Sequence, residues 1–109
     1  MNNDQSNNQD FNQEIENAII LYEKCVGHFA TRTRSMIKQH GIIKALEKLM
    51  DNADLQKGFK TLRDKNMLDK TFEAVMIKYK DKININKKAI EVAKFRYNNP
   101  YWEDKHSGD

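Results

Sequence analysis

The residues that could do chemistry in this chain are few and lie apart. The single cysteine, Cys25, precedes His28 by three residues, so on a helix the two side chains would lie near each other. A cysteine nucleophile also needs a base oriented by a third group and a site for the oxyanion, and no motif for these accompanies the pair. We therefore interpret Cys25 as a partly buried structural residue.

Metal and carboxylate chemistry has as little support. Apart from His28 beside Cys25, none of the three histidines lies at ligand spacing from another histidine, a cysteine or a carboxylate on one helix face. Asp69 and Glu73 share a helix face and could act as a pair, but a helix N-cap followed by a first-turn carboxylate is the simpler interpretation. The chain also lacks phosphate-loop and dinucleotide-binding glycine patterns. The sequence therefore predicts that the protein is not an enzyme and uses no metal or cofactor.

Basic residues form two clusters that suit an anionic partner. Arg34 and Lys38 are four residues apart and share a helix face, as do Lys60 and Arg63. The forked guanidinium group of arginine binds phosphate or carboxylate oxygens well. The binding residues that we predict are Arg34, Lys38, Lys57, Lys60 and Arg63. We expect Arg32 to pair instead with an acid at the core edge, such as Asp69 or Glu73.

The charge distribution favours the same function. Residues 17–102 hold 18 lysines and arginines against 9 acidic residues, a net charge of +9, whereas the whole chain carries +3. Such a body attracts nucleic acid, phosphorylated ligands or an acidic protein surface, although a lysine-rich solvated surface with no binding role is the alternative. The function that we predict is a binding module whose basic face docks an anionic partner, nucleic acid slightly favoured over an acidic protein surface.

Two aromatic residues near the C-terminus form a second candidate contact. Asn98 suits a helix stop and Pro100 disfavours helix at Asn99, so Tyr101 and Trp102 follow the last helix. These aromatics either fold back onto the core edge or form an exposed patch for a partner. The alternative function is a protein–protein adaptor or inhibitor that binds through a helix groove and through Tyr101 and Trp102.

The elements that position these residues are helices. Apolar residues recur at three- and four-residue steps, which predicts helices over about 11–29, 30–40 and 42–51, with Gly41 ending the second. The break between the first two is open, because one long helix also fits the pattern. One proline and four glycines in the chain argue against a turn-rich all-β fold.

Capping residues predict three further helices. Asp54 can cap one helix, Asp69 can cap another that begins at Lys70, and Asn84 or Asn86 can cap the last. We therefore predict an all-α fold, a compact bundle of five or six short helices in a single domain over 11–98.

The chain ends and the cellular setting follow from composition. Residues 1–10 are rich in asparagine, glutamine and aspartate, which predicts a disordered tail, and we expect a flexible C-terminal tail over 99–109. The apolar run 18–22 is far shorter than the roughly 20 residues of a membrane-spanning helix. We therefore expect no membrane partner and a cytoplasmic protein.

The order of residues over about 19–97 forms a pattern in two halves. The first half reads Ala30-Thr31-Arg32, Met36-Ile37, His40-Gly41, Ala45 and Leu49. The second half reads Gly58-Phe59, Leu62 and, most specifically, the Leu-Asp-x-Thr-x-Glu run at 68–73. In this order the chain resembles a family of small, uncharacterised bacterial proteins, from whose pattern Met67 and Lys70 depart. The resemblance implies a compact helical domain and lends no known activity.

Overall fold

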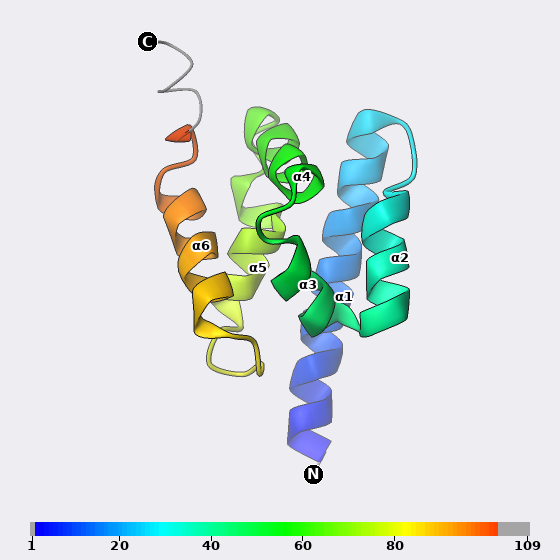
Figure 1. Cartoon of the computed structure of the whole chain (residues 1–109), viewed down its shortest axis with the longest axis vertical. Helices are drawn as coiled ribbons and strands as arrows, with labels where there is room; N and C mark the ends of the chain where they lie inside the picture. The colour runs from blue at the N-terminus through cyan, green and yellow to red at the C-terminus, as the bar shows by residue number, and fades with distance from the viewer. Residues whose placement is uncertain (1, 103–109) are drawn as a thin grey trace.

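The computed structural model describes residues 2–102, and their side chains from Gln9 onward. Over these residues the chain is built from helices and loops without a strand (Figure 1). The helices are α1 (Asn2–Val26), α2 (Thr31–His40), α3 (Ile42–Leu49), α4 (Ala53–Asp64), the 3₁₀ helix η1 (Leu68–Lys70), α5 (Phe72–Lys78) and α6 (Lys87–Asn98). The predicted compact all-α bundle is confirmed.

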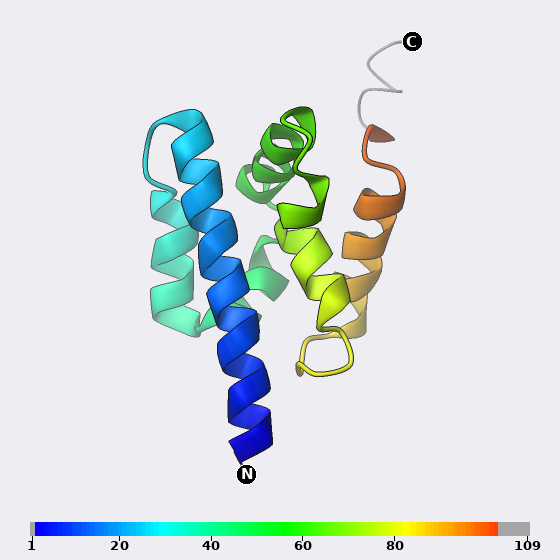
Figure 2. The same cartoon turned by 180° about the vertical axis from the view of Figure 1, so that it is seen from behind.

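Helix α1 begins at Asn2 and runs through residues 2–10, the segment for which composition predicts a tail. Its first turns project beyond the other helices (Figures 1 and 2). Gln9 and Asp10 are exposed, and Phe11 is the first described side chain that is buried. Of the predicted C-terminal tail, residues 103–109 lie outside the described part of the chain.

The open question about the first two helices is settled by a loop at residues 27–30. Gly27 has a φ of +81°, which favours glycine, and it ends α1. The backbone N–H of Ala30 then donates to the Glu23 carboxylate at 2.8 Å. Gly41, also with a φ of +81°, ends α2 as the sequence predicts.

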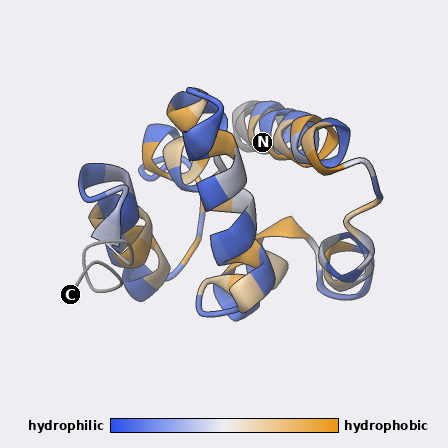
Figure 3. Ribbon diagram, turned by 90° about the horizontal axis from the view of Figure 1, so that it is seen from above, coloured by the Kyte–Doolittle hydropathy of each residue, from blue (hydrophilic) through white to orange (hydrophobic). Residues whose placement is uncertain are grey.

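The core lies where α1, α3, α4, α5 and α6 turn their apolar stripes toward one another. Seen from above, apolar and polar residues are interspersed along the ribbon (Figure 3). Helix α1 packs against α4 and α5, and α5 packs against α6. The largest fully buried apolar side chains are Phe11, Ile15, Ile19, Leu46, Leu49, Phe59 and Met76.

Two of the predicted helix caps are wrong. Asn52 caps α4, because its extended backbone lets the side chain accept the N–H of Asp54, and Asp54 itself lies in the first turn. Thr71 caps α5 by accepting the N–H of Ala74 at 3.1 Å, because Asp69 lies inside the 3₁₀ turn that precedes the helix. For the last helix Asn86 is the cap, one of the two predicted alternatives.

Candidate functional site

The first predicted binding residue, Arg34, faces helix α1. Its guanidinium donates to both carboxylate oxygens of Glu23, at 2.7 and 2.8 Å, and to Glu16 at 2.9 Å. These hydrogen bonds lower the pKa of Glu23 to about 2 and raise the pKa of Arg34. Arg34 therefore braces the loop between α1 and α2, whereas Lys38 is exposed farther along α2.

In the second basic cluster, the side chains of Lys60 and Arg63 contact the C-terminal segment of the chain. Arg63 is only 8% exposed, and it donates to Asp64 and to the carbonyl of Pro100, each at 2.8 Å. Its guanidinium also lies 4.3 Å from the ring centroid of Tyr101. Lys60 places its Nζ 5.8 Å from the ring centroid of Trp102. These contacts hold the C-terminal segment against α4.

The two C-terminal aromatics behave differently. The ring of Trp102 lies 5.5 Å from that of Phe59, and the Arg96 guanidinium lies 5.5 Å from the Trp102 ring. Trp102 thus folds back onto the core edge, the first of the two predicted alternatives. Tyr101 is 49% exposed beside Arg63.

Arg32 does not pair with Asp69 or Glu73. The start of α2 lies beside the start of α4, so the partner of Arg32 is Asp54, at 3.4 Å on the surface. With Lys57, Arg32 lines a hollow of about 130 Å³ next to the exposed ring of Phe29.

The Asp69–Glu73 carboxylate pair does not form one site. Glu73 is 1% exposed and accepts from Arg96 at 3.0 Å, and burial raises the pKa of its carboxyl group. Arg96 also donates to the carbonyl of Met50, so the ion pair joins α5, α6 and the end of α3 inside the protein. Asp69 lies outside, at the surface.

The other chemical candidates also remain separate. His28 is exposed and places Nδ1 3.2 Å from the carbonyl of Phe29, while Cys25 is half-buried. Among the side chains that the structure describes, from Gln9 to Trp102, no group of three histidine, cysteine, aspartate or glutamate residues could hold a metal ion. No helix in this part of the chain is long and apolar enough to cross a membrane.

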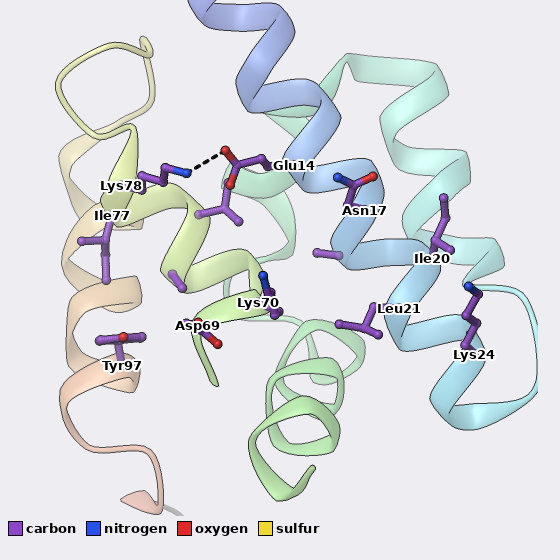
Figure 4. Close-up of a pocket in the computed structure, with 13 residues that line it drawn as sticks. Glu14, Asn17, Ile20, Leu21, Lys24, Asp69, Lys70, Ile77, Lys78 and Tyr97 are labelled. Atoms are coloured by element: carbon purple, nitrogen blue, oxygen red, sulfur yellow. Dashed lines mark hydrogen bonds and ion pairs between the residues drawn. The ribbon is translucent and has the colours of Figure 1, made fainter. Parts of the chain in front are cut away.

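A hollow with a volume of about 750 Å³ runs between α1 and α5. We call it the α1/α5 groove (Figure 4). Its apolar lining comes from Ala18, Ile20, Leu21, Ala74, Val75 and Ile77. Its charged lining comes from Glu14, Lys24, Asp69, Lys70 and Lys78, and the polar side chains of Asn17 and Tyr97 complete it. The alternative function predicted from the sequence includes a helix groove but does not locate it, although Ile20 and Ile77 are apolar residues outside the inward stripes.

One end of the α1/α5 groove is closed by a polar network. The Glu14 carboxylate accepts the Tyr79 hydroxyl at 2.6 Å and Lys78 at 2.9 Å. The hydrogen bond from Tyr79, followed by that from Lys78, lowers the pKa of Glu14, and the same contact raises the pKa of Tyr79 to about 12. Lys78 is therefore neutralised within the groove, whereas Lys24 and Lys70 form no ion pair with any described residue.

Comparison with protein families, curated proteins and solved structures finds no match to this chain. The resemblance to a small bacterial family stays a prediction.

Proposed function

We propose that this protein is a non-enzymatic binding module that docks a partner protein in the α1/α5 groove. The observation that carries the proposal is the groove itself, about 750 Å³ in volume, with apolar side chains between charged ones. A concave surface with an apolar centre and a few polar groups is typical of binding sites. This function is the adaptor that the sequence offers as its alternative, with the groove in place of Tyr101 and Trp102 as the contact.

The contacts of the predicted basic residues support a protein partner over nucleic acid. Binding along a phosphate backbone needs cations that can leave their own partners and follow the strand. Arg34 is held by two carboxylates of α1, and Arg63 is buried against Asp64 and Pro100. The exposed lysines of the two clusters, Lys38 and Lys57, lie on different helices.

A non-enzymatic role is supported by the separation of the reactive side chains. Glu73 is committed to Arg96 in the interior, and Asp69 lies at the surface. Nucleophilic catalysis requires a nucleophile within hydrogen-bond reach of its base, and paired carboxylate catalysis requires both carboxylates at one site.

The test uses one groove variant and one matched control. Ile20 is 38% exposed in the groove, and Phe95 is 53% exposed on α6 outside it. A partner captured from nuclease-treated lysate would be identified, purified and titrated against the full-length chain, Ile20→Glu and Phe95→Glu. We expect Ile20→Glu to weaken binding about tenfold or more, because a central apolar contact contributes most to affinity, and Phe95→Glu to bind as the parent does.

Equal binding by both variants would contradict the groove as the docking site. The competing function makes a separate prediction. Titration against short DNA and RNA, with Lys38→Glu and Lys57→Glu as variants, would show tight, salt-sensitive and lysine-dependent binding if nucleic acid were the partner.

A further inference from the structure

We propose that the segment bound in the α1/α5 groove is an amphipathic helix of about three turns with acidic residues along one edge. This inference rests on the proposed function and specifies the chemistry of the partner at the same site.

The length follows from the residues that line α1. They run from Glu14 to Lys24, and ten residues of helix rise about 15 Å, close to three turns. A bound helix of that length presents apolar anchors at positions i, i+3 or i+4, and i+7.

The shape of the groove suits a helix because both walls are themselves faces of helical segments. On α1 the lining residues recur at three- and four-residue steps, as Glu14, Asn17, Ala18, Leu21 and Lys24. On α5 the same steps give Ala74, Ile77 and Lys78, and Lys70 lies on η1 just before the extended Thr71. The lining of the groove includes the small side chains of Ala18 and Ala74. A third helix laid there would pack its ridge between two existing ones, the usual geometry of helix packing.

The acidic edge that we propose for the bound helix follows from the positions of Lys24 and Lys70 in the groove. Lys78 is already paired with Glu14, at 2.9 Å. Lys24 on α1 and Lys70 on η1 lie on different walls, and neither forms an ion pair within the described residues (Figure 4). Asp69 lies on the side of Tyr97, toward α6. Carboxylates on the partner helix would meet Lys24 and Lys70, and such rim pairs set specificity and association rate more than affinity.

The test compares two synthetic peptides of about three helical turns with one apolar stripe in common. One carries glutamates along the edge of the stripe and the other carries lysines, and each is titrated against the full-length protein by fluorescence anisotropy. We expect the glutamate peptide to bind about tenfold more tightly at low salt, with the difference shrinking as salt is added.

Reversing the charge of selected lysines shows whether the preference for the glutamate peptide arises in the groove. The variant Lys24→Glu with Lys70→Glu should lose or invert the preference, whereas Lys88→Glu with Lys94→Glu, two exposed lysines of α6 outside the groove, should keep it. Equal binding of both peptides, or a preference for the lysine peptide, would overturn this inference. If Ile20-dependent binding of the natural partner persisted, the proposed function would stand and only the acidic helix would be excluded.

Discussion

At the scale of single residues, the basic side chains fall into two groups. Some are paired with a carboxylate of the protein itself, and others form no ion pair with a described residue. Arg34 sits opposite Glu16 and Glu23 of α1 and is used to hold a loop. Arg96 is used to neutralise a carboxylate inside the protein. Lys24 and Lys70 have apolar groove residues beside them and form no ion pair with a described residue, although the charge of Lys70 is near enough to help lower the pKa of Glu14.

The Glu23–Arg34 pair makes stability depend on pH. The pKa of Glu23 is about 2 in the folded protein against an ordinary value of 4.5. A lowered carboxyl pKa means that the pair stabilises the fold fully above about pH 4.5 and loses its effect as the pH falls toward about 2. We expect Glu23→Gln to lower the free energy of unfolding at pH 7 by about 1–2 kcal/mol.

Denaturant titration of the parent chain and Glu23→Gln across this pH range measures the effect. The free energies of unfolding of the parent chain and of Glu23→Gln should converge as the pH approaches about 2. A difference that stays constant with pH would show that the carboxylate charge of Glu23 does not stabilise the loop.

At the scale of elements, the apolar stripes and cap residues predicted α2 to α6 and the part of α1 from Phe11 onward, because both are local properties of the sequence. The caps were harder, since Asn52 and Asp54, or Asp69 and Thr71, are good cap residues two positions apart. The backbone conformation that decides between such neighbours depends on how the preceding turn packs.

The cap of α5 gives a direct prediction. Thr71 is fully buried, and its hydroxyl donates to the carbonyl of Leu68 while accepting from the N–H of Ala74. We expect Thr71→Ala to cost about 0.5–2 kcal/mol in the free energy of unfolding. Asp69→Ala, an exposed change in the 3₁₀ turn, should stay within about 0.5 kcal/mol. Thermal and denaturant melts of the two variants measure these losses. A larger loss of unfolding free energy for Asp69→Ala than for Thr71→Ala would show that Asp69 is the cap of α5.

At the scale of the whole molecule, contacts between distant segments determine which candidate sites form. Glu73 and Arg96 are 23 residues apart, and Arg63 and Pro100 are 37 apart, so neither pair could be predicted from spacing. The α1/α5 groove has the same origin. Ile20 lies beside the buried stripe of α1, and whether it faces solvent or another helix depends on where α5 lies.

Trp102 illustrates the same point at the end of the chain. Because its ring packs against Phe59 and lies near Arg96, we expect Trp102→Ala to destabilise the fold by about 2 kcal/mol, less than a fully buried tryptophan would. Partner affinity of the folded protein should be unchanged. Unchanged stability with lost partner binding would instead make Trp102 a contact residue.

The central claim, that a partner occupies the α1/α5 groove, is tested most directly by hydrogen–deuterium exchange of the full-length protein with and without its purified partner. We predict slower amide exchange on binding in α1 over 14–24 and in the wall formed by η1 and α5 over 70–78. Slower exchange confined to α2 and α4, around Lys38 and Lys57, with no change in the groove segments, would contradict the claim.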